Sequence, residues 1–139
     1  MADSAIEPKR LDIHIAFLPQ SGGSVQYGIR PVLIVQNNKG NANSSTVIVA
    51  PITKQHKHTL PTHVKINPDT GVTCPSIVLC EQLQTIDKMM LRRKIGRIRK
   101  AGDINKINQA LCVSLELIKE EVMNENDSNT MQKQHQHML

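Results

Sequence analysis

Aromatic side chains are nearly absent from this chain. Its 139 residues contain one phenylalanine, Phe17, one tyrosine, Tyr27, and no tryptophan. RNA-recognition motifs and OB-folds stack bases on several exposed rings, so the composition argues against a platform of that kind. Any nucleic acid would be held by charge and backbone contacts, which the net charge of +5 at pH 7 permits without proving.

Long apolar runs and paired cysteines are also missing. No run approaches the roughly 20 apolar residues that a helix needs to span a bilayer. The opening segment, MADSAIEPKR, lacks the apolar centre of a secretory signal. The cysteines, Cys74, Cys80 and Cys112, show no CxxC spacing, and their odd number favours a reducing compartment over a disulfide framework. We therefore expect a cytoplasmic protein that does not enter the membrane.

Three common catalytic signatures do not occur. The sequence contains no GxSxG, HExxH or GxxxxGK[ST] pattern, so a serine hydrolase, a zincin or a P-loop enzyme lacks support. His56, His58 and His63 could in principle bind zinc. However, no cysteine or carboxylate completes a recognisable spacing, and Lys57 stands between two of the histidines. We predict a solvated basic loop here and no metal site.

Short apolar runs separated by turn-forming residues predict several strands. In LDIHIAF, residues 11–17, alternation predicts that the odd-numbered side chains face the core. The run TVIVAPIT, residues 46–53, is expected to be a strand ended by Pro51. Further strands are predicted for IRPVLIVQN (29–37), THVKIN (62–67) and PSIVLCEQL (75–83), with a mobile binding loop at 18–28 and a polar turn, NKGNANSS, at 38–45.

The C-terminal half is predicted to contain helical segments as well as a strand. TIDKMML, residues 85–91, predicts a short helical turn. In RRKIGRIRK, residues 92–100, Ile95 and Ile98 reach one face only if the strand slips phase, and a bulge at Gly96 would allow this. A helix is predicted to follow with Asp103 as its N-cap. Its buried side would contain Ile104, Ile107, Leu111, Leu115 and Ile118.

This order of elements predicts a mainly β fold with α: a small, strongly bent β-barrel capped by a C-terminal helix. The pattern has no βαβ alternation, which argues against a parallel Rossmann-type sheet. We expect a flexible N-terminal segment at residues 1–9 and the folded domain at 10–119. Residues 120–139, rich in Asn, Gln, His and Met, are expected to form a disordered tail.

One group of polar residues suggests a phosphate site. Pairing of the two central strands as an antiparallel hairpin would place Arg30, at the start of one, beside Thr53, at the end of the other. A guanidinium and a hydroxyl at one point suit a phosphate or an oxyanion. The competing interpretation is structural: Arg30 pairs with a carboxylate such as Glu81, and Thr53 caps a turn.

Two further segments carry polar or basic groups. RRKIGRIRK contains six of the 17 Lys and Arg residues, which suits a nucleic-acid backbone, an acidic partner or simply a solvated face. In CEQLQTIDK, the residues Glu81, Gln82, Gln84 and Thr85 follow a buried strand and should emerge at a rim. Amide side chains there could read base edges or close a turn.

These segments together resemble the MazF/PemK family of toxins from bacterial toxin–antitoxin pairs. The matching pieces are GSVQ with GIRPVLIVQNN, then TVIVAPIT, LPTHVKI, SIVLCEQLQTIDK and INQALCVSLELI, from about Arg10 to Lys119. The resemblance implies an SH3-like barrel of the CcdB/PemK type and a homodimer. It further implies a ribosome-independent endoribonuclease that needs no metal or other cofactor and is silenced by a cognate, MazE-like antitoxin with an acidic C-terminal segment. Such enzymes cut single-stranded mRNA at a short sequence and leave a 2′,3′-cyclic phosphate and a 5′-hydroxyl.

The resemblance also assigns roles to residues. It makes Arg30 and Thr53 catalytic, and its RNA-binding set comprises Ser24, Gln26, Tyr27, Lys54, His56, His63, Glu81, Gln82 and Gln84. The chain departs from many relatives at Val25, where they carry glutamate, and at Gln84, where they often carry a basic residue. Two alternatives follow: a toxin of the same fold that inhibits gyrase without catalysis, and a catalytically weak RNA-binding module.

Overall fold

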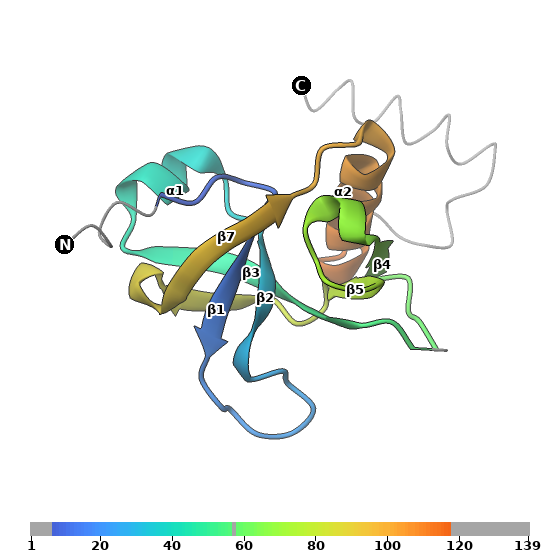
Figure 1. Cartoon of the computed structure of the whole chain (residues 1–139), viewed down its shortest axis with the longest axis horizontal. Coiled ribbons are helices and arrows are strands. Elements are labelled where there is room, and N and C mark those ends of the chain that lie inside the picture. Colours follow the sequence, from blue (N-terminus) through green and yellow to red (C-terminus); the bar gives the residue numbers. More distant parts are fainter. Residues whose placement is uncertain (1–6, 57, 118–139) are drawn as a thin grey trace.

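A curved antiparallel sheet and one long helix make up the computed structural model, which describes residues 7–56 and 58–117 (Figure 1). The predicted tail at 120–139, Ile118, and residues 1–6 of the predicted N-terminal segment lie outside the described residues. The elements in chain order are β1 (Asp12–Leu18), β2 (Gly28–Ile34), α1 (Asn38–Asn43), β3 (Thr46–Lys54), β4 (His63–Ile66), the 3-10 turn η2 (Pro68–Thr70), β5 (Ser76–Leu79), β6 (Gln84–Asp87), the 3-10 turn η3 (Lys88–Met90), β7 (Leu91–Arg97) and α2 (Ala101–Ser114).

The sheet has seven strands in the order β4-β5-β3-β2-β1-β7, and β6 pairs with β3 beside this path. All neighbouring strands are antiparallel. The sheet bends without closing, since β4 and β7 remain its two ends. A mainly β, barrel-like fold with a C-terminal helix is therefore confirmed (Figure 1).

β3 is longer than predicted because Pro51 does not end it. Pro51 lies within the strand, opposite Val32 of β2. One residue later the chain pairs with β5 instead, with Ile52 opposite Val78. Proline therefore lies where β3 passes from one partner strand to the other, at the edge of a ladder, where its missing N–H costs least.

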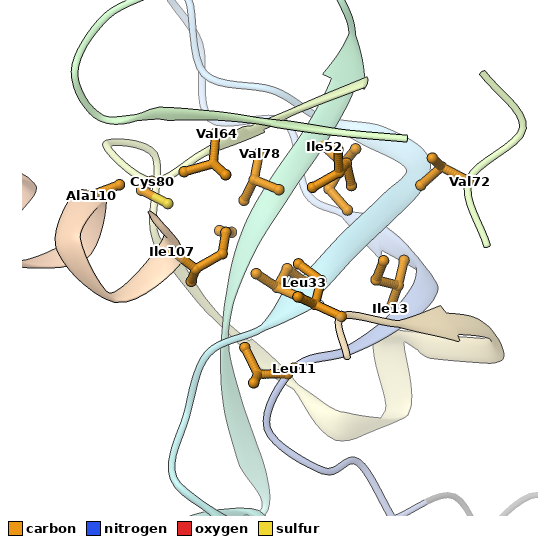
Figure 2. Close-up of a cluster of buried hydrophobic side chains, with 13 residues drawn as sticks. Leu11, Ile13, Leu33, Ile52, Val64, Val72, Val78, Cys80, Ile107 and Ala110 are labelled. Atoms are coloured by element: carbon orange, nitrogen blue, oxygen red, sulfur yellow. The ribbon is translucent and has the colours of Figure 1, made fainter. Parts of the chain in front are cut away.

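Two hydrophobic cores lie on opposite faces of the sheet. The helix-side core contains Leu33 and, from α2, Ile107 and Ala110; its other members are Leu11, Ile13, Ala50, Ile52, Val64, Ile66, Val72, Val78, Cys80 and Ile98 (Figure 2). The second core contains Ala16, Leu18, Val32, Ile34, Val47, Val49, Ile86 and Leu91. Successive residues of β2 thus enter different cores, which explains why its apolar run is continuous instead of alternating.

The face predicted for β1 is wrong over the second half of the strand. Ile13 is fully buried as expected, but Ala16 and Leu18 are buried too, whereas Phe17 is 39% exposed. Both cores reach this strand, so alternation could not indicate which face is inside. The pairing of β1 with β7 also shifts register twice.

The bulge predicted near Gly96 is confirmed. Ile13 of β1 pairs with Gly96, and the next residue, His14, pairs with Lys94. Ile95 of β7 is therefore an extra residue without a partner on β1. Ile98 is fully buried in the helix-side core, and Ile95 packs partly against the same core. The slip therefore brings both isoleucines to one side.

The C-terminal helix α2 begins earlier than predicted. Its N-cap is Lys100, which makes no capping hydrogen bond through its side chain, and Asp103 lies in the first turn instead of at the cap. A carboxylate in the first turn still favours the positive end of the helix dipole. Ile107 is buried as predicted, but Leu115 follows the helix and is 55% exposed.

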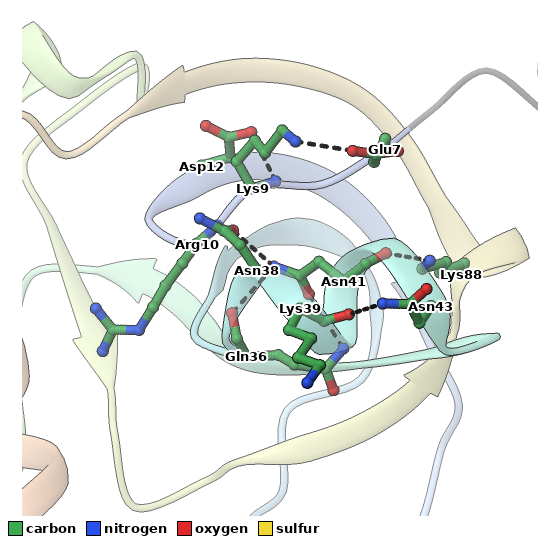
Figure 3. A network of polar contacts seen from close by, with 10 residues as sticks. All are labelled: Glu7, Lys9, Arg10, Asp12, Gln36, Asn38, Lys39, Asn41, Asn43 and Lys88. Atoms are coloured by element: carbon green, nitrogen blue, oxygen red, sulfur yellow. Dashed lines mark hydrogen bonds and ion pairs between the residues drawn. The ribbon is translucent and has the colours of Figure 1, made fainter.

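The segment predicted as a polar turn forms the short helix α1. Asn37 caps it by accepting a hydrogen bond from the Gly40 N–H through its side chain. Buried Asn41 bonds to the Gln36 carbonyl and accepts from the Gln36 amide (Figure 3). Arg10, whose backbone N–H donates to Asn38 of α1, also donates a hydrogen bond from its guanidinium to Asn108 of α2 at 2.8 Å.

Candidate functional site

Arg30 stands at the entrance of β2, where the chain leaves the loop at residues 19–27. Gly28 has a φ of 85°, a conformation that favours glycine, and this turns the loop into the strand. The Arg30 Nε donates a hydrogen bond to the Tyr27 carbonyl at 3.0 Å. Within the described part of the chain, the terminal nitrogens of this half-buried guanidinium have no protein partner and no carboxylate pairs with it. The side chain is thus anchored at one nitrogen and open at the others.

Thr53 lies at the same end of the β2–β3 ladder. The β2–β3 ladder ends at the pair Val32–Pro51, and Arg30 and Thr53 each lie two residues beyond that pair on their own strands. β3 turns to β5 there, so Thr53 pairs with Ile77. Its side chain is half-buried. The predicted placement of both residues at one end of the hairpin agrees with this register, and their chemical roles remain predictions.

Two glutamines tie the loop to the body of the protein. Gln82 accepts from the Gln26 N–H at 2.9 Å and donates to the Ser24 carbonyl at 3.4 Å. Gln84, on β6, donates to the Gln26 carbonyl at 3.2 Å. Because β6 pairs with β3, these bonds connect the loop to the strand that carries Thr53. In this structure both amide groups therefore hold protein backbone.

An open hollow of about 400 Å³ lies between this loop and the start of β2. Residues 23–27 and Arg30 line it, and Thr53 is not among its lining residues. Tyr27 is half-exposed beside it, and Val25 also lines it. The hollow has room for a phosphate or a sugar next to the open side of the guanidinium.

Glu81 forms a separate cluster and not the ion pair with Arg30 considered above. Its carboxylate accepts from the Thr62 hydroxyl at 3.0 Å and lies 2.9 Å from the His63 Nε2. The Leu60 N–H donates to the other ring nitrogen, Nδ1. That nitrogen must therefore be unprotonated, so Nε2 carries the proton and donates it to Glu81.

The predicted RNA-binding residues thus fall into two groups. Ser24, Gln26, Tyr27, Gln82 and Gln84 gather around the loop next to Arg30. The second group contains His63, Glu81 and His56, whose ring meets that of His63 edge-on with centroids 6.1 Å apart. Lys54 is exposed at the end of β3. Thr62 was missed, and nothing in its sequence neighbourhood signals that it binds Glu81.

The basic segment at 92–100 is partly neutralised by the protein itself. Buried Asp12 accepts from Arg97 at 2.6 Å and pairs with Lys94 at 3.2 Å. Lys100 pairs with Asp69, which raises the pKa of the lysine through their hydrogen bond and charge. Arg93 is exposed and has no carboxylate partner in the described ranges. Three of the six basic residues, Lys94, Arg97 and Lys100, therefore pair with carboxylates of the protein itself.

Neither metal nor thiol chemistry is indicated at these positions. Across residues 7–56 and 58–117, no three His, Cys, Asp or Glu side chains gather as a metal site. Cys80 is fully buried, and burial, followed by the charge of Glu81, raises the pKa of its thiol to about 12. A thiol with that pKa is a poor nucleophile. None of the helices in these ranges has the length and apolar character required to cross a membrane.

The bent sheet and the terminal helix define a small, barrel-like β protein with an open guanidinium beside a polar loop. Residues 9–115 match the model of the PemK-like, MazF-like toxins of type II toxin–antitoxin systems. The chain belongs to this family.

Individual relatives give the same picture. The chain is 46% identical over 112 residues to Endoribonuclease EndoA of Bacillus subtilis, covering 79% of this chain and 96% of that protein. It is 40% identical over 111 residues to Endoribonuclease MazF of Staphylococcus saprophyticus, covering 78% and 92%. The Mycobacterium tuberculosis toxin MazF-mt6 superposes with a TM-score of 0.66 at 31% identity, covering 78% and 99%. A mycobacterial endoribonuclease in complex with its cognate antitoxin also superposes with a TM-score of 0.66, at 28% identity, covering 81% and 98%.

Proposed function

We propose that this protein is an endoribonuclease toxin that cuts single-stranded mRNA at a short sequence, without a metal ion and without the ribosome. The observation that carries the proposal is the Arg30 guanidinium, which is fastened through Nε to the Tyr27 carbonyl and has no carboxylate partner in the described residues. It lies at the same strand end as Thr53. Family membership and relatives that are named endoribonucleases support the assignment.

The chemistry requires stabilisation of charge on a phosphate. The ribose 2′-hydroxyl loses its proton as its oxygen bonds to the adjacent phosphorus. The bond from phosphorus to the 5′-oxygen breaks and that oxygen takes up a proton, so a 2′,3′-cyclic phosphate and a 5′-hydroxyl result. Negative charge grows on the non-bridging oxygens, where the open side of Arg30 and the Thr53 hydroxyl would donate hydrogen bonds. Since Arg30 is already anchored, little reorganisation accompanies the reaction. An arginine with a pKa above about 12 is a poor general base, so its role is electrostatic.

Its partners follow from the same assignment. We infer that a cognate, MazE-like antitoxin neutralises the protein, since complexes of this kind are known for structural neighbours. The protein would act in the cytoplasm, where mRNA is available. We also infer a homodimer, because β1 and β2 carry an uncovered apolar face. Phe17 and Ile29 lie opposite each other there and are 39% and 73% exposed.

The direct test is incubation of the purified protein with a long RNA in EDTA, followed by mapping of the cut ends by primer extension. We expect cuts at one recurring short sequence, with cyclic-phosphate ends that block ligation at the 3′-hydroxyl until the phosphate is removed. Intact RNA from folded, antitoxin-free protein would overturn the proposal. Tight RNA binding without cuts would indicate a binding module, with Val25 as the first suspect, and gyrase inhibition would indicate the other toxin class.

A further inference from the structure

The turn that leads into β4 is closed by two hydrogen bonds between the same two residues. The Leu60 carbonyl accepts from the His63 N–H at 2.9 Å, and the Leu60 N–H donates to the His63 Nδ1 at 3.0 Å. Pro61 follows Leu60, and its ring fixes φ at about −65°, the value that the second residue of such a turn requires. The turn is thus held by its backbone and by the side chain of the first residue of β4.

Glu81 connects this turn to the segment that follows β5. One carboxylate oxygen accepts from the Thr62 hydroxyl at 3.0 Å, and the other lies 2.9 Å from the His63 Nε2. β4 and β5 are paired, with His63 opposite Leu79, so the carboxylate reaches across the end of this ladder (Figure 1). The His63 side chain is only 7% exposed. Both of its ring nitrogens therefore have a protein partner and little contact with solvent.

A proton added to this ring can enter at one place only. Because Nε2 already carries a hydrogen, the added proton goes to Nδ1, which then becomes a donor. The N–H of Nδ1 and the N–H of Leu60 would point at each other across 3.0 Å, so their hydrogen bond is lost. The bond from Nε2 to Glu81 instead gains an opposite charge and becomes stronger. Proton uptake therefore breaks one of the two contacts of the ring and strengthens the other.

The charged groups around the ring act in both directions. Glu81 favours a positive charge on His63. The ring of His56, whose centroid lies 6.1 Å away, disfavours that charge once it is itself protonated. Lys65 of β4 and Lys106 of α2 line the groove between these two elements together with His63, and they also disfavour it.

We propose that His63 is a pH-sensitive switch: uptake of a proton at Nδ1 frees the Leu60 N–H and loosens the end of the loop between β3 and β4. Among the described residues from 56 to 61, only Leu60 makes a hydrogen bond to another described residue. The order of this part of the loop therefore depends on Leu60. The same loop carries His56, a predicted RNA contact.

The direct test follows the Leu60 amide and the His63 ring of the full-length protein by NMR. The titration runs between about pH 8 and 5, where histidine side chains exchange their proton. We expect the Leu60 amide resonance to move together with the ring signals of His63. Corrected for its intrinsic rate, the Leu60 amide should exchange with solvent about tenfold faster in the protonated form, because it has lost its acceptor.

Asparagine at position 63 separates the acceptor from the titration. Its Oδ1 lies close to the place of the histidine Nδ1 but takes up no proton in this range, so His63→Asn should keep the Leu60 bond at every pH. The matched control is His56→Asn, which removes the neighbouring imidazole and should leave the pH response of Leu60 intact. Circular dichroism verifies that both variants are folded.

Three results would overturn the proposal. The first is a Leu60 amide that keeps its resonance while the His63 ring takes up a proton. The second is a His63 ring that takes up no proton in the range of the titration. The third is a pH response of Leu60 that persists in His63→Asn. The first two are read on the unmodified protein, so they do not depend on the folding of a variant.

The consequence for RNA rests on the proposed function. We expect the KM for RNA of the unmodified protein to rise severalfold relative to that of His63→Asn as the pH falls. The ratio of their kcat values should stay constant, because Arg30 and Thr53 lie outside the switch. A merely structural role of His63 would change KM by one factor at every pH. A protein that cuts no RNA would contradict the proposed activity, while the NMR titration would still decide on the switch.

Discussion

At the scale of single residues, we expect the anchoring of Arg30 to matter more for cleavage than its charge alone. Its Nε bond to the Tyr27 carbonyl fixes the plane of the guanidinium, which leaves its terminal nitrogens in a defined direction. Lysine would keep the charge but could not hold that bond and also present a fork to a phosphate. We expect Arg30→Lys to lower kcat about a hundredfold, with an unchanged melting temperature. Single-turnover cleavage of an RNA that contains the mapped site measures the loss.

A charge control accompanies this variant. Arg93→Lys is an identical change at an exposed position on β7, and it is expected to leave kcat unaltered. Full activity of Arg30→Lys would show that only a positive charge is needed at this place. The proposed fork geometry would then be wrong.

Thr53 can be tested through its hydroxyl alone. Valine has nearly the same shape and suits a strand equally well, so Thr53→Val removes a donor while β3 remains intact. We expect the cleavage rate to fall about tenfold or more, and the thermal unfolding curve to stay in place. Thr53→Ser, which restores a hydroxyl, should recover most of the rate. Equal rates for the valine and serine variants would exclude a role for the hydroxyl.

The sequence was informative about residues that lie next to short, continuous apolar runs. Arg30 and Thr53 border such runs, so their position at one end of a hairpin followed from strand pairing alone. Gln82 was harder to interpret, because its partners, Gln26 and Ser24, lie more than fifty positions away and are set by the tertiary fold. Asp103 was misplaced as an N-cap because the helix starts at Ala101, and a capping residue type cannot by itself locate a helix end.

At the scale of elements, the loop between β1 and β2 is held by hydrogen bonds from two side chains outside the loop, those of Gln82 and Gln84. Gln82→Leu removes both of its bonds to the loop. We expect the Gln26 amide, which donates to Gln82, to exchange about tenfold faster with solvent, and kcat/KM to fall as the loop loosens. Hydrogen exchange followed by NMR reports the first effect. Gln20→Leu is the control, since Gln20 is exposed in the same loop. An unaltered exchange rate of the Gln26 amide would contradict the role of Gln82 in holding the loop.

The contact between η2 and β7 depends on glycine. A Cβ placed on Gly96 would lie 1.7 Å from the Thr70 carbonyl oxygen, so the backbones could not approach as they do. We expect Gly96→Ala to lower the free energy of unfolding by on the order of 3 kcal/mol. Gly102→Ala in the first turn of α2 meets nothing within 4 Å and should be neutral or slightly stabilising. Urea denaturation compares them, and equal stabilities would contradict the close approach.

Most strands were predictable, but β6 was not: of the segment 85–91 predicted as a helical turn, residues 85–87 belong to a strand paired with β3, and only Lys88–Met90 forms a turn. The buried face of β1 was not predictable either. Runs of β-branched residues identified β2, β3 and β5, where burial on both sides needs no periodicity. β1 misled the prediction because the cores on its two faces hide Ala16 as well as Ile13. The helix α1 was missed because side-chain bonds from Asn37 and Asn41, and not a hydrophobic period, support its six residues. Such bonds become visible only once the chain has folded.

For the molecule as a whole, an open sheet leaves two edges, and they differ in character. β7 carries the exposed basic residues Arg92, Arg93 and Lys94, a common protection against unwanted pairing. β4 has a single lysine, Lys65, and a groove with an apolar floor beside it. The two edges therefore differ in charge, with three exposed lysine or arginine side chains on β7 and one on β4. Overall net charge would not have distinguished the two.

The uncovered face of β1 and β2 leads to the last prediction, which concerns assembly. Phe17 pairs with Ile29, and Ile15 with Pro31, so four apolar side chains lie together on the face of the sheet opposite the second core. A patch of this kind on one chain matches the same patch on a second copy related by a two-fold axis.

We expect the protein to sediment as a dimer and Ile29→Glu to convert it to a folded monomer, since burying a carboxylate against Phe17 of the other copy is costly. Met89→Glu is the matched control, because Met89 is 81% exposed yet lies outside this patch, and it should remain dimeric. A dimer that is equally stable in both variants would place the interface elsewhere and leave the exposure of Ile29 to another partner.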